Sequence, residues 1–412
     1  MLFRSGTLWC WGYNNYGQLG DGTIVSCNKP VQVGIETDWI QVSTGYYHTC
    51  GVRQDGTLWC WGVNGTGQLG DGTFVNSLLP VQVGTYSDWV QISTGKWHTC
   101  GIKQEEEIWC WGSNAYGQLG DDTVEYKNLP VPAGTDTDWR QVSGGLSHTC
   151  AIRQDGTIWC WGSSANGALG NGTINDYHTP FQAGTDINWR QVSTNDYRTC
   201  ATRQDNTLWC WGYNGSGMLG DGTNTMRLIP TQIGTGVEWL QVSVGRFHAC
   251  AVGQDGGLWC WGSNEFGQLG FGIKGGSKSS PIEVDTDDNF ISFDAGGAHT
   301  CSIAENSTLW CWGANGFGQV GDNTNKTRFS VTQIDPEIKW LQTSSGYQHT
   351  CAIKEDNTLW CWGGNIYGQV GTNTYDDEQF LPVQVENDND WLQVSAGTNH
   401  TCAIRQNREL WC

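Results

Sequence analysis

Sixteen cysteines of the 412-residue chain fall into eight pairs, and the two members of each pair are ten residues apart. The pairs are Cys50 with Cys60, Cys100 with Cys110, Cys150 with Cys160, Cys200 with Cys210, Cys250 with Cys260, Cys301 with Cys311, Cys351 with Cys361 and Cys402 with Cys412. Two further cysteines, Cys10 and Cys27, stand outside this pattern. Because a regular cysteine spacing is typical of a cross-linked framework, the first chemistry that the sequence indicates is disulfide formation.

Each cysteine pair flanks a short hairpin that can bring its two thiols together. A three-residue turn, Gln54-Asp55-Gly56, places Cys50 directly opposite Cys60 when residues are counted outward from it. Directly opposed residues reach the Cα separation that a disulfide needs, provided that the position is not hydrogen-bonded. We therefore predict one structural disulfide per hairpin and an oxidising compartment. The alternative interpretation is buried free thiols in a cytosolic protein.

A histidine lies two residues before most of the first cysteines, which raises the question of metal binding or catalysis. These histidines are His48, His98, His148, His248, His299, His349 and His400. One unit offers three nitrogen and sulfur donors, whereas structural zinc takes four, and Arg198 replaces histidine in the fourth unit. A histidine repeated in nearly every unit is typical of a structural hydrogen bond, so we expect no catalytic residue, no metal site and no cofactor.

The cysteines must be positioned by a repeated structural unit. The segment Leu-Trp-Cys-Trp-Gly, or its Ile variant, recurs along the chain, and its first Trp falls at positions 9, 59, 109, 159, 209, 259, 310, 360 and 411. Within one unit, residues 39–43, 48–53, 57–61 and 80–84 have the composition and alternation of short strands. We predict an all-β fold, a β-propeller of four-stranded antiparallel blades with eight repeats of about 50 residues. Seven or eight blades fit this pattern, in a single domain spanning residues 1–412.

The charge balance and composition exclude several classes of partner. The chain has 41 Asp and Glu against 21 Lys and Arg, a formal net charge of -20, and no cluster of basic residues. Phosphate binding relies on such clusters, so we expect no nucleic acid and no anionic membrane surface as a partner. The sequence contains no run of about 18 consecutive apolar residues, so we predict no insertion into a membrane. We expect a protein partner and a monomeric chain, and the acidity favours a basic partner surface.

Three linked motifs recur in register: Gly45 to Val52, Asp55 to Gly62 and Asn114 to Gly120 are clear copies. In this the chain resembles the regulator of chromosome condensation repeat family, in particular its cysteine-rich, bacterial-type members. The resemblance covers essentially the whole chain and implies a β-propeller, usually of seven blades. It also implies roles as different as guanine-nucleotide exchange, ultraviolet sensing, ubiquitin-ligase assembly and secreted inhibition of β-lactamase.

The sequence departs from the family pattern in two respects. Cysteine occupies positions where the family usually has an aliphatic or small residue, and the Gly-Gln-Leu-Gly motif or its variant occurs eight times. No unit contains an insertion long enough to form an additional wedge-like arm, which argues against exchange activity. The sixth unit has Phe290 in place of the first-strand Trp and an altered linker over residues 271–276.

One loop position varies between aromatic and small residues, which makes it a candidate for partner binding. The aromatic members are Tyr16, Tyr116, Phe266, Phe317 and Tyr367, and they alternate with Thr66, Asn166 and Ser216. Loops rich in Tyr, Gly and Asn on a rigid ring suit protein contact. In the alternative interpretation, these rings only cap the core of each blade.

The two ends of the chain carry copies of the same strand, Gly6 to Cys10 and Glu409 to Cys412. These copies compete for one place beside Cys402, so closure at eight blades pairs Cys10 with Cys402, whereas a local hairpin pairs Cys402 with Cys412. The chain begins near a motif and ends inside one, as expected of a fragment. We predict a non-enzymatic protein-binding scaffold, secreted or at the cell surface. The alternatives are a cytoplasmic exchange-factor-like regulator of a small GTPase and a secreted enzyme inhibitor.

Overall fold

The computed structural model describes residues 6–286, 288–374 and 376–406, which form a ring of antiparallel sheets. The strands of the first four blades are β3 (Trp39–Thr44), β4 (His48–Arg53), β5 (Leu58–Gly62), β6 (Ser77–Gln82); β7 (Trp89–Thr94), β8 (His98–Lys103), β9 (Ile108–Gly112), β10 (Lys127–Pro132); β11 (Trp139–Gly144), β12 (His148–Arg153), β13 (Ile158–Gly162), β14 (Tyr177–Gln182); β15 (Trp189–Asn195), β16 (Arg198–Arg203), β17 (Leu208–Gly212) and β18 (Arg227–Ile233).

The next three blades contain β19 (Trp239–Val244), β20 (His248–Gly253), β21 (Leu258–Gly262), β22 (Lys278–Glu283); β23 (Phe290–Ala295), β24 (His299–Ala304), β25 (Leu309–Gly313), β26 (Arg328–Ile334); β27 (Trp340–Ser345), β28 (His349–Lys354), β29 (Leu359–Gly364) and β30 (Glu378–Gln384). The closing blade combines β31 (Trp391–Ala396) and β32 (His400–Gln406) with β1 (Gly6–Gly12) and β2 (Cys27–Gln32). Two 3-10 turns, η1 (Ala165–Gly167) and η2 (Gly215–Gly217), are the helical segments of the described residues, and neither has the length or apolarity to cross a membrane.

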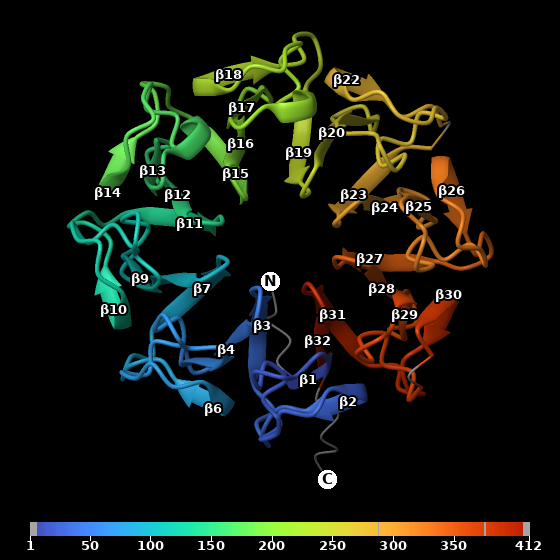
Figure 1. Cartoon of the computed structure of the whole chain (residues 1–412), viewed down its shortest axis with the longest axis horizontal. Coiled ribbons are helices and arrows are strands. Elements are labelled where there is room, and N and C mark those ends of the chain that lie inside the picture. The colour runs from blue at the N-terminus through green and yellow to red at the C-terminus, as the bar shows by residue number, and fades with distance from the viewer. Residues whose placement is uncertain (1–5, 287, 375, 407–412) are drawn as a thin grey trace.

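Figure 1 shows the blades arranged around a central opening, with the first strand of each blade nearest the axis and the fourth strand outermost. The described residues make eight such blades, each of four antiparallel strands. The predicted β-propeller is therefore confirmed, and of the two predicted blade numbers the structure has eight. We number the blades 1 to 7 from β3 onward and call the last one the closing blade.

The closing blade joins the two ends of the chain (Figure 1). β1 pairs with β32 over seven residue pairs, from Gly6↔Gln406 to Gly12↔His400, and Cys10 lies opposite Cys402. These two cysteines form a disulfide across 392 residues of sequence. The predicted pairing of Cys402 with Cys412 is therefore wrong, because β1 occupies the place beside β32 that a local hairpin would need. Cys412 itself lies outside the described residues.

The other seven predicted cysteine pairs are joined within their own hairpins, as the spacing predicts. In blade 1, Arg53 N donates to Thr57 O at 2.9 Å and closes the three-residue turn. This register places Cys50 opposite Cys60, with a Cα separation of 4.1 Å.

The hairpins of blades 2 to 7 share this register, and each of them carries its predicted disulfide. The bonds join Cys100 with Cys110, Cys150 with Cys160, Cys200 with Cys210, Cys250 with Cys260, Cys301 with Cys311 and Cys351 with Cys361. In every one of these hairpins the two cysteines are directly opposed across the second and third strands. Cys27 is the one free cysteine of the described residues.

The hydrophobic core lies between neighbouring blades. Trp61 of blade 1 is fully buried and packs edge-on against Trp39 at 5.9 Å, in a cluster with Leu8 and Cys10 of the closing blade. Its indole Nε1 donates to the carbonyl of Gln18, also in the closing blade, at 2.9 Å. Gly20 has φ +72°, and a Cβ atom there would lie 2.8 Å from the same indole nitrogen. The Trp therefore requires glycine in the loop of the preceding blade.

Candidate functional site

The two faces of the ring are built from different connections. One face carries the turns between the first and second strands and the loops after the third strands, such as residues 45–47 and 63–76. We call it the turn face. The other carries the hairpins between the second and third strands and the linkers between blades, and we call it the hairpin face. Backbone hydrogen bonds such as Trp89 N to Gly56 O, at 3.0 Å, hold linker and hairpin together there.

The hairpin face carries cations that are already engaged. Arg153 lies over Trp139 and Trp159, with its guanidinium carbon 4.9 and 4.6 Å from the two ring centroids, and pairs with Asp136 at 2.6 Å. Equivalent cations stack in other blades, at Arg53, Lys103, Arg203, Lys354 and Arg405. Blades 5 and 6 have Gly253 and Ala304 instead. This repeated Trp–cation–Trp sandwich was not predicted, although its sequence signal is a basic residue that recurs with a period of about 50 residues.

The turn face opens into a cavity of about 490 Å³ on the ring axis, lined by the first turn of every blade. Its charged lining residues are Lys96, Asp196 and Arg246, and the last two face each other at 3.9 Å. Lys96 lies over the ring of Tyr46 at 4.6 Å, and Arg246 over that of Tyr347 at 5.3 Å. Aromatic rings at the rim of this cavity therefore already accept cations.

Six aromatic residues form a continuous row on the turn face, across the junction where the ring closes. We call Tyr367, Tyr13, Tyr16, Tyr47, Tyr46 and Trp97 the aromatic row. The ring centroids of Tyr367 and Tyr13 are 4.8 Å apart, those of Tyr16 and Tyr47 5.1 Å, and the row continues to Trp97, 6.0 Å from Tyr47. These residues come from blade 7, the closing blade, and blades 1 and 2.

Two phenols of the aromatic row, those of Tyr13 and Tyr47, have a raised pKa. Burial raises the pKa of Tyr47, and the neighbouring tyrosines raise it further. Burial likewise raises the pKa of Tyr13, with a further contribution from Tyr16. A neutral tyrosine presents an electron-rich ring face together with a hydroxyl that can donate or accept a hydrogen bond.

The five loop aromatics predicted as partner-binding residues all lie in loops of the turn face, but the structure does not gather them into one site. Tyr16 and Tyr367 belong to the aromatic row and are 38% and 37% exposed. Tyr116 and Phe266 are exposed on other blades, whereas Phe317 is half-buried. Tyr13, Tyr46, Tyr47 and Trp97 were not predicted. Their signal is the variation at the positions before the repeated histidine and after Trp-Gly, where other blades carry both small and aromatic residues, such as Ser113 and Tyr213.

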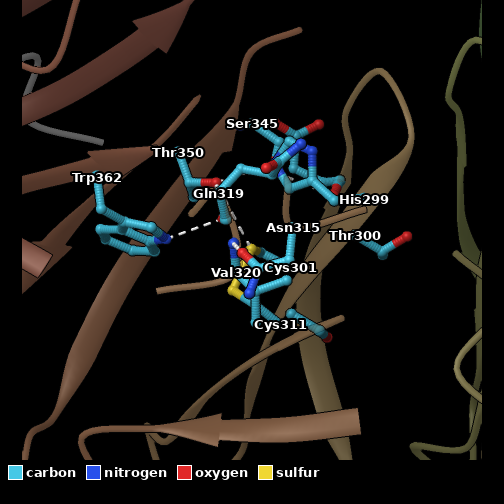
Figure 2. The surroundings of a disulfide bond; sticks show 12 residues. His299, Thr300, Cys301, Cys311, Asn315, Gln319, Val320, Ser345, Thr350 and Trp362 are labelled. Atoms are coloured by element: carbon cyan, nitrogen blue, oxygen red, sulfur yellow. Dashed lines mark hydrogen bonds between the residues drawn. A yellow bond between two sulfur atoms is a disulfide. The ribbon is translucent and has the colours of Figure 1, made fainter. Parts of the chain in front are cut away.

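The repeated histidines lie in the interior between blades and not at either face. In Figure 2, Trp362 and Thr350 both donate to the carbonyl of Gln319, at 2.9 and 2.8 Å, beside the Cys301–Cys311 disulfide. His299 Nε2 lies 2.9 Å from Thr350 Oγ1. Because the threonine proton goes to Gln319, the histidine must be the donor in this contact. Figure 2 also shows Asn315, whose side-chain oxygen accepts from Val320 N at 2.9 Å and orders the loop.

This histidine–threonine contact links successive blades into a belt around the ring. Equivalent pairs are His48–Thr99, His98–Thr149, His148–Thr199, His248–Thr300, His349–Thr401 and His400–Thr49. Burial lowers the pKa of each belt histidine, to about 3 for His48 and about 4 for His299. The belt histidines are therefore neutral and structural. No three His, Cys, Asp or Glu side chains within the described ranges are grouped so as to hold a metal ion.

The belt has one different link, between blades 4 and 5. Arg198 is buried and donates to the carbonyls of Gly245 and His248, the latter at 3.0 Å. Ala249 stands where other blades have the accepting threonine. The two substitutions are complementary. The longer Arg198 side chain reaches backbone carbonyls, and Ala249 lacks the hydroxyl with which a histidine at position 198 would form its hydrogen bond.

The model of the RCC1-like domain matches residues 1–240, and the Regulator of chromosome condensation (RCC1) repeat matches residues 255–303, 306–353 and 356–404. The chain belongs to the RCC1 repeat family. The RCC1 resemblance stated from the sequence is thus confirmed. No curated protein matches the chain in sequence.

Solved RCC1-type propellers share the fold at low identity. Human WBSCR16 superposes with a TM-score of 0.70 at 20% identity, over 98% of this chain and 100% of that one. Prp20p from Saccharomyces cerevisiae, described with its binding to Gsp1p and histones, gives 0.68 at 18% identity, over 99% and 93%. A second structure of that yeast RCC1, bound to Kap60, gives 0.69 at 18%, over 99% and 91%. At this identity the likeness concerns the fold.

Proposed function

We propose that this RCC1-type propeller is a non-enzymatic scaffold that grips a protein partner with its turn face. The observation that carries the proposal is the aromatic row, because Tyr and Trp supply large contact areas with few side-chain torsions to fix. Short, tightly paired strands hold the loops behind it, so a partner would meet a preformed surface. The yeast relative's binding of Gsp1p, histones and Kap60 supports a protein as the partner.

We place the protein outside the cell or on its surface. Eight disulfides in the described residues support an oxidising compartment, because cytosolic reductants keep regular cysteine pairs reduced. The framework of disulfides within blades and histidine contacts between blades leaves the turn face free to vary, as expected of a scaffold. An exchange-factor-like regulator of a small GTPase and a secreted inhibitor of an enzyme stay the alternatives. Acceleration of guanine-nucleotide release, or inhibition of a target enzyme, would favour one of them over the scaffold.

The test compares two variants that remove a half-buried tyrosine from opposite faces. Tyr47→Ala shortens the aromatic row, whereas Tyr86→Ala removes a ring that packs against Trp89 and Lys103 at the hairpin face. Wild-type and variant proteins are immobilised and exposed to the extracellular milieu of the source organism, and captured proteins are identified by mass spectrometry. We expect the captured partner to be lost with Tyr47→Ala and kept with Tyr86→Ala. Equal capture by both variants would contradict the use of the turn face.

A further inference from the structure

The loops that carry the closing-blade end of the aromatic row are acidic. The two loops that carry Tyr13, Tyr16 and Tyr367, residues 13–26 and 365–377, contain three aspartates and no lysine or arginine. These aspartates are Asp21, Asp376 and Asp377. Asp21 accepts hydrogen bonds from Asn14 and Thr23, which are neutral donors, so its charge is not paired there. The charge of these two loops therefore favours a cationic partner over an anionic one.

The opposite end of the row already shows which ligand such rings accept. Lys96 places its ammonium 4.6 Å from the centroid of Tyr46, and no other cation stacks on the row among the described residues. At the other end, Tyr13, Tyr16 and Tyr367 have tilted or edge-on packing, with interplanar angles of 65–70°. In an edge-on pair the edge of one ring meets one face of the other, and the exposed parts of Tyr16 and Tyr367, 38% and 37%, are where a cation from outside can reach a ring.

The remaining charge of the chain acts in the same direction. The hairpin face carries acidic hairpins and linkers, such as Glu105-Glu106-Glu107 and Asp136 with Asp138, and most of its cations are stacked between tryptophans. The formal net charge of -20 raises the rate at which a basic partner meets the protein. The aromatic row then selects among partners, since a flat guanidinium gains more from ring stacking than from charge alone.

We propose that the closing-blade end of the aromatic row, Tyr13, Tyr16 and Tyr367, binds arginine side chains of a basic, extended segment of the protein partner. This inference rests on the proposed function and adds the chemistry of the partner to it. The segment lies along the row, its guanidinium groups stack on the tyrosine rings, and Asp21, Asp376 and Asp377 supply the opposite charge.

The same positions of other blades provide a matched control. Tyr116 stands at the position of Tyr16 and is 46% exposed, and Tyr213 stands at the position of Tyr13 and is 42% exposed. Neither forms a ring contact with another aromatic residue of the described part of the chain. The double variants Tyr13→Leu/Tyr16→Leu and Tyr116→Leu/Tyr213→Leu therefore remove the same two residue types at equivalent positions. Both leave the net charge unchanged.

The experiment measures binding of two labelled peptides by fluorescence anisotropy at about 150 mM salt, where exposed charges are largely screened beyond a Debye length. The first peptide has four Gly-Arg-Ser repeats, and the second has citrulline, the uncharged near-isostere, in place of each arginine. We expect the arginine peptide to bind at least tenfold more tightly than the citrulline peptide. The Tyr13→Leu/Tyr16→Leu variant should lose about tenfold in affinity for the arginine peptide, and the control variant less than twofold. Tyr16→Phe, which keeps the ring, should bind like the wild type.

Each contrary outcome has a distinct meaning. Equal binding of both peptides, weakened by Tyr13→Leu/Tyr16→Leu, would overturn the cationic preference and leave the turn face as a binding site. Equal losses in the two double variants, or no measurable binding of the arginine peptide, would overturn the inference. If capture of the native partner were also unaffected by Tyr47→Ala, the proposed function would fail with it. Unfolding midpoints of all variants exclude misfolding as the cause, and the comparison of the arginine and citrulline peptides on the wild-type protein keeps the proposal testable if a leucine variant does not fold.

Discussion

Cys10 and Cys402 face each other across β1 and β32 with their Cα atoms 4.1 Å apart, although 392 residues separate them in sequence. The other described disulfides each join cysteines only ten residues apart. One covalent bond therefore locks the whole ring, and seven lock single hairpins. This difference gives the first prediction.

Removing the ring-closing disulfide should destabilise the protein more than removing one hairpin disulfide. In the chain-entropy model a cross-link stabilises by constraining the unfolded chain, by about 3 kcal/mol for a loop of about ten residues and about 6 kcal/mol for one of about 400 residues. We expect Cys10→Ser/Cys402→Ser to lower the free energy of unfolding by about 3 kcal/mol more than Cys50→Ser/Cys60→Ser. Denaturant unfolding under non-reducing conditions measures both. Equal losses would show that strand pairing alone closes the ring.

The count of free thiols should be low. Sixteen of the 18 cysteines are disulfide-bonded in the described residues, so no more than two remain for titration. We expect a thiol reagent in denaturant to find about two thiols without reductant and 18 with it. If about 18 thiols were titrated without reductant, the alternative interpretation would hold, in which the protein is cytosolic and its cysteines are small buried apolar residues.

Acid should weaken the belt of histidines. Their folded-state pKa values are lowered to about 3 or 4 by burial, so they are neutral in the folded protein and take up protons only on unfolding. Their stabilising contribution is complete above the unfolded pKa of about 6.5 and is lost as the pH falls toward about 4. Each histidine then costs about 1.4 kcal/mol per pH unit. The unfolding midpoint should fall steeply between about pH 6.5 and about pH 4.5.

A variant isolates the histidine contribution to this pH dependence. His98→Gln removes one titrating group and should reduce the slope of unfolding free energy against pH by about one proton in this range. Arg198→Gln is the control, since arginine does not titrate there, and it should leave the slope unchanged. A slope that both variants change equally, or neither changes, would contradict the assignment to the belt.

The link between blades 4 and 5 can be converted to the usual type. Arg198→His alone leaves the imidazole without the threonine that the other blades provide, because position 249 is alanine. Arg198→His/Ala249→Thr should restore the contact, so we expect a favourable coupling of about 1 kcal/mol between the two substitutions. A double-mutant cycle from denaturant unfolding measures it. Simple additivity would show that Arg198 and Ala249 act independently.

The features that can be predicted from the sequence are those determined within a single repeat. Hairpin register follows from counting outward from Gln54-Asp55-Gly56, and the Cys50–Cys60 bond follows from that register. The number of blades does not follow in this way, because adding one blade changes only slightly the angle between neighbouring blades, as where Trp61 of blade 1 packs in one cluster with Leu8 of the closing blade. The choice between Cys10 and Cys412 as the partner of Cys402 depends on where the ring closes. The sequence within a single repeat does not determine the position of this closure.

The aromatic row was predictable only in part for the same reason. Tyr16 and Tyr367 are visible as exceptions at one repeated position, so the sequence identifies them as candidates. That Tyr13 lies between them, 4.8 Å from Tyr367, depends on two ends of the chain meeting in space. Phe266 and Phe317 share the sequence signal, but neither makes a ring contact with the aromatic row in the described residues, so the pattern alone overestimates the site.

The pairing of β1 with β32 also determines how the protein would respond to a pulling force. Gly6 and Gln406 are paired with each other at one end of the two strands. Tension applied between them would therefore separate the residue pairs one after another from that end. Only the four pairs from Gly6↔Gln406 to Trp9↔Ala403 can separate before the load reaches Cys10–Cys402. Beyond that point the tension runs through a covalent bond, and the blades of the ring carry none of it.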